Sequence, residues 1–380
     1  MFFPDIRRAL HVPRFLTPFL LLLLALVAGV AAWGVATRPG GNVATSPQVL
    51  PDIASVRSVA YTIPGHDFDD VVVRRADGLG EEQVVATFPN SGATGYHIHG
   101  SASPLGDFVA VVSLPPFTAR SGANLSILTL ADGSVRSVAG RFDYFTRVAW
   151  SPDGTKIAAV RYQDANGARQ NSVVEVDTAT GAVRAVAQFS DAFDVVPVGY
   201  SFDSSRLYIV VVDNRGSNLF LERDGKVQLE AELSPGRTRD WALSPDGSRL
   251  AFVDILAGGS RTYVGRTLVI ATKSVTTLPA TANQFGASWM PGSPLPAFGG
   301  PGGSWQLTDP GAAEAYLVPS AWSPDSMYLA GAVYAPAGTD ATVRSLELVQ
   351  RETSTAPGHR VVLTDVPGAA FLGWVRNQLP

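Results

Sequence analysis

The sequence contains no cysteine, almost no lysine and little charge of either sign. Without cysteine the chain has neither a disulfide nor a cysteine-linked lipid anchor. Charged residues make up 16% of the chain and the formal net charge is −4. Nucleic-acid-binding proteins carry basic patches, so this composition argues against a nucleic-acid partner. Lysine occurs only at positions 156, 226 and 273, and such a preference for arginine is typical of GC-rich bacterial genomes.

Sequence motifs that carry catalytic chemistry are also missing. Gly199–Asp203 and Gly286–Met290 each lack the second glycine of a nucleophile elbow. The glycine-rich run at 299–303 lacks the lysine and the following helix of a phosphate-binding loop. The acidic stretch Asp67–Asp70 does not match a calcium loop, and we interpret it as a solvated loop. We therefore expect no cofactor, and a binding protein is favoured over an enzyme.

Long apolar runs are absent with one exception, residues 15–36 (FLTPFLLLLLALVAGVAAWGVA). A helix of this length spans a hydrocarbon core of about 30 Å. Arg7, Arg8, His11 and Arg14 precede the run, which predicts a cytoplasmic N-terminus at 1–14. Residues 15–36 are then a signal anchor in a bacterial plasma membrane, 37–54 a flexible tether rich in Gly and Pro, and 55–380 an extracytoplasmic domain. The alternative is a cleaved signal peptide, which leaves a secreted or periplasmic protein.

A short phrase recurs along the remainder of the chain. Its clearest copies are Trp150-Ser-Pro-Asp-Gly154, Leu243-Ser-Pro-Asp-Gly247 and Trp322-Ser-Pro-Asp-Ser326. Weaker copies begin at Tyr200, Ser103 and Trp289. The copies recur at intervals of roughly 33 to 50 residues, which is typical of repeat architectures. Proline presets φ, aspartate bonds nearby backbone and glycine accepts a positive φ, so the phrase predicts a tight turn.

Each turn lies within a set of four predicted strands. In the clearest set the strands are Phe145–Trp150, Lys156–Tyr162, Asn171–Asp177 and Val183–Phe189. Four antiparallel strands per repeat predict one blade of a β-propeller, an all-β fold. Similar sets begin at His97, Val195, Arg239 and Ser320, and the stretch 285–318 is a compressed copy. The aromatic residue that ends each first strand, Trp150 among them, is predicted to be core packing.

Two incomplete sets remain at the ends of this region. Residues 369–375 resemble a first strand, whereas 56–63, 70–75 and 83–88 resemble second, third and fourth strands. Together they predict one blade built from both ends of the domain, which closes the ring and hides its sheet edges. The count is then seven blades, or six if the compressed copy is not an independent blade.

These phrases are similar to the repeat of the TolB-type, WD-like β-propellers over residues 55–380. The resemblance implies the propeller fold, whereas the repeat phrase itself is a packing and turn motif and implies no activity. TolB proteins carry an α/β domain ahead of the propeller. Only about 20 residues separate the apolar segment from the first predicted strand, so we do not expect that domain here.

The strongest candidate for metal chemistry is His97-Ile-His99. Alternate residues of a strand share one face, so both imidazoles are predicted to point the same way near the central channel. A metal site needs further ligands, for which His66, His359 or an Asp from another blade are candidates, and the alternative is hydrogen-bonded packing between blades. No metal is predicted from the pair alone.

Segments that enter the inner strands carry further polar residues, and loops on a rigid scaffold are where binding residues gather. The predicted binding residues at the mouth of the channel are His97, His99, Tyr144, Arg147, Asp194, Arg239 and Asp240. We expect this mouth to bind a protein or peptide of the cell envelope, or a glycan. The alternatives are a metal-assisted hydrolase or lyase at the central channel, and a purely structural scaffold subunit.

Overall fold

The computed structural model describes residues 58–90, 92, 95–115, 122–165, 168–256, 262–280, 282–301, 315–337, 340–351 and 359–376. The chain divides into two units, residues 1–50 and 51–380, and all of the described residues belong to the second unit. No helix within the described ranges is long and apolar enough to cross a membrane. The predicted anchor at 15–36 and the tether at 37–54 lie outside these ranges.

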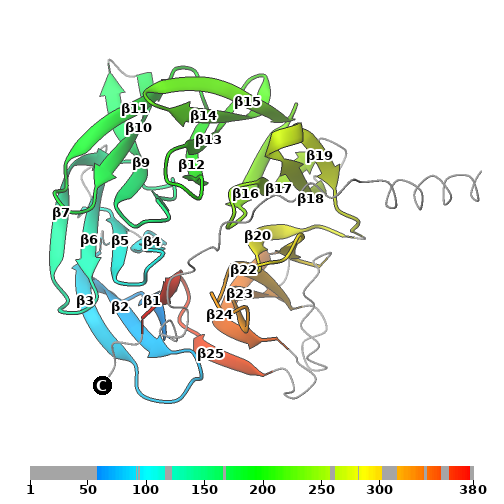
Figure 1. Cartoon of the computed structure of the whole chain (residues 1–380). Helices are drawn as coiled ribbons and strands as arrows, with labels where there is room; N and C mark the ends of the chain where they lie inside the picture. Colours follow the sequence, from blue (N-terminus) through cyan, green and yellow to red (C-terminus); the bar gives the residue numbers. More distant parts are fainter. Residues whose placement is uncertain are drawn as a thin grey trace, which may run out of the picture. The chain divides into compact units, whose positions relative to one another are not determined.

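The described strands form successive antiparallel sheets in an all-β, propeller-like arrangement (Figure 1). One sheet has the order β26 (Phe371–Val375), β1 (Ser58–Ile63), β2 (Phe68–Arg75) and β3 (Gln83–Pro89). An eight-stranded sheet contains β4 (His99–Ala102), β5 (Phe108–Ser113), β6 (Ala123–Thr129), β7 (Val135–Phe142), β8 (Ala149–Trp150), β9 (Lys156–Ala165), β10 (Ala168–Asp177) and β11 (Val183–Phe189). The next comprises β12 (Asp194–Tyr200), β13 (Leu207–Asp213), β14 (Gly216–Arg223) and β15 (Lys226–Ser234). It is followed by β16 (Arg237–Leu243), β17 (Arg249–Leu256), β18 (Thr262–Val269) and β19 (Ser274–Thr277), with the 3-10 turn η2 (Ile270–Thr272) before β19. The last two contain β20 (Phe285–Trp289) and β21 (Pro296–Gly299), and β22 (Tyr316–Trp322), β23 (Tyr328–Ala337), β24 (Asp340–Gln350) and β25 (Arg360–Thr364).

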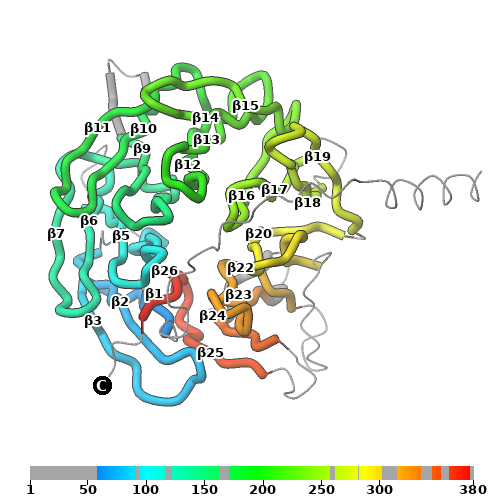
Figure 2. Tube along the Cα trace, viewed as in Figure 1, coloured from blue at the N-terminus to red at the C-terminus, as the bar shows by residue number. Residues whose placement is uncertain are grey.

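The two ends of the described domain meet in one sheet, as the sequence predicted. β26 pairs antiparallel with β1, with Ser58 opposite Val375 and Val59 opposite Trp374. Figure 2 shows the red C-terminal trace of β26 beside the blue trace of β1. Because β1 then has a neighbour on both sides, its backbone groups are not left as an open sheet edge.

The recurring Ser-x-Asp phrase forms the same hydrogen-bonded turn in each clear copy. In the first, the Ser151 hydroxyl donates to Asp153 Oδ1 at 2.6 Å and accepts the Lys156 N–H at 2.9 Å. Asp153 Oδ1 also accepts the Thr155 N–H at 3.0 Å. Equivalent serine–aspartate bonds of 2.5 Å occur at Ser201–Asp203, Ser244–Asp246 and Ser323–Asp325. These aspartates are turn formers, as predicted.

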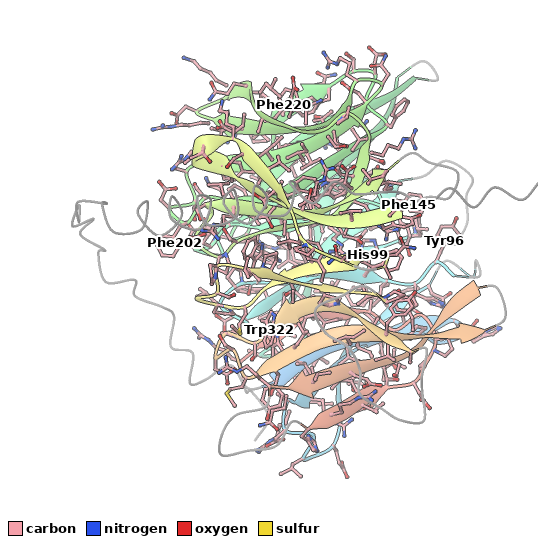
Figure 3. All side chains as sticks on the ribbon, turned by 90° about the vertical axis from the view of Figure 1, so that its right-hand side faces the viewer. Tyr96, His99, Phe145, Phe202, Phe220 and Trp322 are labelled. Atoms are coloured by element: carbon pink, nitrogen blue, oxygen red, sulfur yellow. The ribbon has the colours of Figure 1, made fainter. Side chains whose placement is uncertain are left out.

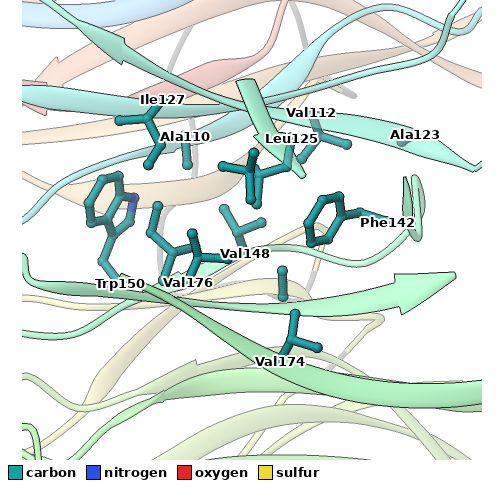
Figure 4. Close-up of a cluster of buried hydrophobic side chains, with 13 residues drawn as sticks. Ala110, Val112, Ala123, Leu125, Ile127, Phe142, Val148, Trp150, Val174 and Val176 are labelled. Atoms are coloured by element: carbon teal, nitrogen blue, oxygen red, sulfur yellow. The ribbon is translucent and has the colours of Figure 1, made fainter. Parts of the chain in front are cut away.

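The aromatic residue before each turn packs between neighbouring blades. Trp150, Trp289, Trp322 and Trp374 are between 6% and 8% exposed. The Nε1–H of Trp150 donates to the Ser101 carbonyl at 2.9 Å, and that of Trp289 donates to the Ala242 carbonyl at 2.9 Å. Figure 4 shows Trp150 within a cluster that includes Ile127, Val148 and Val176. The predicted role in core packing is confirmed.

Two expected elements differ in the structure. The strand predicted at Phe145–Trp150 is reduced to the two residues of β8, because the chain turns at residues 144–146, where Asp143 Oδ1 accepts the Phe145 N–H at 2.9 Å. The compressed copy contributes the two-stranded sheet β20–β21, whereas residues 302–314 lie outside the described ranges.

Candidate functional site

The segments that lead into the innermost strands lie on one side of the domain, which we call the entrance face. Tyr96 and Phe145 project from this face, whereas Phe202, in the turn between β12 and β13, lies on the opposite side (Figure 3). Phe145 is 76% exposed and Phe202 is 49% exposed. Each face therefore carries an exposed phenylalanine, so that substitutions of Phe145 and Phe202 can be compared as a test of which face binds a partner.

A buried carboxylate holds the first entrance segment in place. Asp69 on β2 is fully buried. Its Oδ2 accepts the Ile98 N–H at 2.9 Å, and its Oδ1 accepts the His97 Nδ1–H at 3.0 Å and the Gly65 N–H at 3.2 Å. Asp69 was expected to lie in a solvated loop, and that prediction is wrong because β2 already begins at Phe68 and turns Asp69 inward. These hydrogen bonds fix the segment before β4 against the sheet of β26, β1, β2 and β3.

Two reciprocal hydrogen bonds, which we call the clasp, join residues 97–99, at the start of β4, to the entrance segment before β8. The Tyr144 hydroxyl donates to the His97 carbonyl at 2.5 Å. The His99 Nε2–H donates to the Tyr144 carbonyl at 2.5 Å, which fixes the imidazole tautomer because a carbonyl only accepts. The clasp therefore holds the two segments rigidly with respect to each other.

Three aromatic rings form a patch above the clasp, and we call Tyr96, Tyr144 and Phe145 the aromatic patch. The Tyr144 ring lies 5.7 Å from that of Tyr96 and 5.3 Å from that of Phe145, between ring centroids. The His99 ring meets Tyr144 edge-on at 4.8 Å. The Phe145 N–H donates to Asp143 Oδ1 at 2.9 Å, which positions the exposed ring. The patch is thus held in one arrangement by packing and hydrogen bonds.

Burial controls the protonation of the groups beneath the patch. Together with the negative charge of Asp69 and the neighbouring Tyr96, it raises the pKa of the Tyr144 hydroxyl to about 12. Burial also lowers the pKa of His99; the hydrogen bond to Tyr144 raises it and the Arg147 charge lowers it. Both side chains are therefore uncharged at neutral pH, which suits hydrogen bonding and apolar contact better than ion pairing.

A second group of predicted residues lies on β16. Arg239 donates its Nε–H to Asp240 Oδ1 at 3.1 Å. Asp240 Oδ2 accepts the Gly286 N–H of β20 at 2.8 Å. Asp240 has a φ of +54°, an unusual value for a non-glycine residue that often occurs at functional sites. The sheets β16–β19 and β20–β21 are joined through this carboxylate.

A row of neighbouring aromatic rings continues from Gly286. Phe285 lies 5.1 Å from Tyr263 and 5.9 Å from Tyr316, and Tyr316 stacks on Tyr334 at 5.6 Å with planes 13° apart. Burial raises the pKa of the Tyr334 hydroxyl, whereas the Arg239 charge lowers it and the Asp240 charge raises it. The end of the row therefore lies within electrostatic reach of Arg239.

The structure distributes the seven predicted residues over distinct places. His97, His99, Tyr144 and Arg147 gather at the clasp, and Arg239 and Asp240 gather at β16. Asp194 is exposed at the start of β12, and no described residue bonds its side chain. The neighbouring Phe193 is covered in part by Arg237, whose guanidinium carbon lies 4.8 Å above the ring.

The expectation that His97 and His99 project from one strand face is wrong. β4 begins at His99, so His97 precedes the strand. His97 bonds Asp69 and His99 bonds Tyr144, which matches the alternative of hydrogen-bonded packing between blades. Among the described residues no group of three His, Cys, Asp or Glu side chains is arranged to hold a metal ion. His66 instead bonds Asp67 at 2.8 Å and is almost fully exposed.

A cavity of about 220 Å³ lies away from these residues. It is lined by Ala76, Asp77, Ser323, Asp325, Met327, Tyr328 and Trp374, on the side of the Ser-Pro-Asp turns. None of the seven predicted residues contributes to it, so the candidate site is a surface and not this cavity.

Asp69, Tyr96, Phe145 and the row of rings that ends at Tyr334 are not recognisable as site residues from the sequence alone. The sequence predicts a strand at Phe145. The one feature that indicates a turn there is Asp143 two residues earlier, whose side chain accepts the Phe145 N–H. The other residues become recognisable only when strands from different blades are placed together.

Comparison with known proteins supports the fold alone. No family model matches the chain, and a search of curated proteins found no match. Among solved structures, TolB from Acinetobacter baumannii superposes with a TM-score of 0.50 at 15% identity, covering 83% of this chain and 67% of that chain. A putative TolB from Agrobacterium tumefaciens gives a TM-score of 0.47 at 16% identity, covering 83% and 92%. An oligogalacturonate lyase in complex with manganese gives 0.47 at 15% identity, covering 70% and 79%.

The sheet arrangement and the likeness to TolB from Acinetobacter baumannii define the chain as a β-propeller. Its fold resembles that of TolB from Acinetobacter baumannii, and the resemblance expected from the repeated phrases is confirmed.

Proposed function

We propose that this chain is a membrane-anchored, extracytoplasmic propeller that binds a protein or peptide of the bacterial envelope on its entrance face. The observation that carries the proposal is the aromatic patch, in which Phe145 is 76% exposed on a rigid base. Binding energy in protein interfaces concentrates in a few aromatic and arginine residues. A patch already held in place by the clasp loses little further entropy on binding.

The chemistry around the patch suits a peptide segment. Arg147 is exposed close to His99, and Tyr144 and His99 are uncharged. Apolar rings flanked by an arginine bind a partner through an aromatic or aliphatic side chain together with polar backbone groups. Asp194 and the Phe193–Arg237 pair extend the binding surface on the next segment along the chain.

A ring of seven blades is part of the proposal. The eight-stranded sheet consists of two sets of four strands joined only through the pairing of Phe142 with Arg161. We therefore treat it as two blades, and β20–β21 as the inner half of a further one. Six sheets, one of them double, support a count of seven.

The anchor rests on the apolar run at 15–36 and on the arginines before it. Because the chain has no cysteine, single introduced cysteines report topology without a background signal. Ser46→Cys in the tether should react with a membrane-impermeant maleimide on intact cells, and Ala9→Cys should react only after the membrane is opened. Equal labelling of both positions on intact cells would contradict the proposed orientation, and release of a soluble protein would indicate a cleaved signal peptide.

Partner binding is tested by capture from detergent-solubilised membranes with the full-length protein. Phe145→Ala should weaken capture by roughly 30-fold, the effect of a central interface residue. Phe202→Ala is the matched control, since it removes an exposed phenylalanine from the opposite face. If the two variants capture the same proteins in the same amounts as wild type, the entrance face is not the binding surface.

A further inference from the structure

The cavity of about 220 Å³ is built from two sheets. One side is the turn Ser323–Tyr328 between β22 and β23, and the other is Ala76 and Asp77 after β2 together with Trp374 of β26. The rings of Tyr328 and Trp374 lie 6.4 Å apart between centroids and are tilted by 38°. Pockets for drug-sized ligands measure about 300–1,000 Å³, so this cavity suits a smaller chemical group.

The turn that lines the cavity differs from the other three clear copies of the Ser-x-Asp turn at two positions. In those copies the residue two places after the aspartate has a hydroxyl that donates to the carboxylate. These bonds measure 2.9 Å from Thr155 and 2.8 Å from Ser205 and Ser248. The residue that follows is a cation in all three copies: Lys156, Arg206 and Arg249.

In the turn at the cavity the same two positions hold Met327 and Tyr328. A thioether and an aromatic ring therefore stand where the other copies have a hydroxyl and a positive charge. Both replacements line the cavity. The departure from the repeat thus coincides with the place where the cavity opens.

The carboxylate of this turn retains free acceptor capacity. Asp325 Oδ1 accepts the Ser323 hydroxyl at 2.5 Å and the Met327 N–H at 3.0 Å. Within the described ranges no group donates to Asp325 Oδ2, and no lysine, arginine or histidine forms an ion pair with this exposed carboxylate. The second carboxylate of the lining, Asp77, is already paired with Arg75 at 2.5 Å and adds no uncompensated charge.

We propose that this cavity binds an alkylammonium group. The ammonium supplies the positive charge that the turn lacks and donates to Asp325, while the alkyl chain contacts the Met327 thioether. Aromatic rings attract cations through their quadrupole, which the Tyr328 and Trp374 rings provide here. The inference goes beyond the proposed function and does not depend on it, because none of the predicted entrance-face residues lines the cavity.

Small probes separate two sources of this group, a lysine side chain and a free amine. N-acetyl-lysine N-methylamide carries the first, and N-acetyl-norleucine N-methylamide is its neutral counterpart. n-Butylamine, protonated at neutral pH, carries the second, and n-butanol is its neutral counterpart. Each probe is titrated into the full-length protein in mild detergent.

Methionine methyl groups provide a local readout. The chain has three methionines, at positions 1, 290 and 327, so the NMR spectrum of protein with ¹³C-labelled methionine methyl groups is simple, and Met327→Leu assigns the signal from the cavity. Met290 does not line the cavity, and its sulfur lies 3.6 Å from Arg351 Nη1. A bound probe should shift the Met327 signal in a saturable manner and leave the Met290 signal in place.

At least one ammonium probe should bind wild type about tenfold more tightly than its neutral counterpart, as expected for a charge-assisted hydrogen bond. Asp325→Asn keeps a side-chain oxygen for Ser323 and Met327 but removes the charge, so it should abolish this preference. Asp246→Asn is the matched control, because it makes the same change in an equivalent turn, and it should retain the preference. An unchanged Met290 signal establishes that each variant is folded.

Binding of the lysine probe would support the inference and identify a lysine side chain of a protein or peptide as the ligand. Binding of n-butylamine alone would also support it and identify a free amine. A Met327 signal that no probe shifts, equal binding of charged and neutral probes, or a preference that survives in Asp325→Asn would overturn the inference.

Discussion

Replacing Asp69 with alanine tests whether the entrance face is held rigid by the sheet beneath it. The substitution removes the acceptor of the Ile98 N–H, on a residue that is 2% exposed, and of the His97 Nδ1–H. A buried donor without a partner costs about 1–3 kcal/mol. Loss of the contact between Asp69 and His97 lowers the unfolding free energy by less than loss of a fully buried pair would, because the histidine side chain is 24% exposed. The sum predicts that unfolding free energy falls by about 3 kcal/mol.

The neighbouring Asp70 provides the control. Its side chain accepts one exposed hydrogen bond, from the Thr87 hydroxyl at 2.6 Å. Asp70→Ala should change the unfolding free energy by no more than about 0.5 kcal/mol. The two substitutions remove the same chemical group from adjacent residues of β2, so the difference between them isolates the buried contacts.

The assay is urea unfolding of the full-length protein in mild detergent, followed by tryptophan fluorescence, together with hydrogen exchange of the Ile98 amide. Asp69→Ala should shift the midpoint to lower urea and accelerate exchange at Ile98, whereas Asp70→Ala should do neither. If both variants unfold at the wild-type midpoint and exchange at Ile98 is unchanged, Asp69 does not hold the entrance segment.

Three further predictions concern the closure, the clasp and a buried ion pair. Deleting residues 371–380 removes β26 and exposes the edge of β1, so size-exclusion chromatography with light scattering should show oligomers; a stable monomer would contradict the closure. Burial lowers the folded-state pKa of His99, so its contribution to stability is complete above the unfolded value of about 6.5 and is lost as pH falls through the lower folded value. His99→Asn should therefore lose less unfolding free energy than wild type between about pH 7 and 5 in denaturant titrations. An equal loss in both proteins would refute the lowered pKa of His99. Glu347, which is 3% exposed, accepts hydrogen bonds from Ser345 and Arg360; Glu347→Ala should lower the unfolding free energy by about 3 kcal/mol, whereas the exposed Glu232→Ala should be neutral, and equal urea midpoints would count against the pair.

The sequence predicted the parts of the fold that depend on local chemistry. The Ser-Pro-Asp turn is made of contacts within five residues, such as those of Ser151 with Asp153 and Lys156. The strand expected at Val183–Phe189 has those same bounds in the structure. Pairing of the two ends could be inferred because a first strand and three later strands were each left without a partner set.

Strand ends next to the site were predicted less well. The run Phe145–Trp150 has the residues of a strand, yet only its last two residues form β8. Tyr144 is instead fixed by bonds to His97 and His99, and these tertiary contacts override local strand preference. A single sequence does not contain the register between blades from which such contacts arise.

The site itself depends on pairs that are far apart in the chain. Asp69 and His97 are 28 positions apart, and His99 and Tyr144 are 45 apart. Sequence reasoning selected His97, His99, Tyr144 and Arg239 as polar residues of entrance segments, but it did not indicate what each side chain contacts. The exposure of Phe145 was also not predictable, because its neighbours suggested a buried strand.

The proposed partner-binding surface is the entrance face, and it can be tested in the native membrane. The most direct measurement is site-specific photo-crosslinking of the full-length protein in its own membranes, with a benzoyl-phenylalanine placed at position 145 or 202. We expect discrete crosslinked products from position 145 that disappear with Tyr96→Ala, and none from position 202. Products from position 202 alone, or no products from position 145, would contradict it.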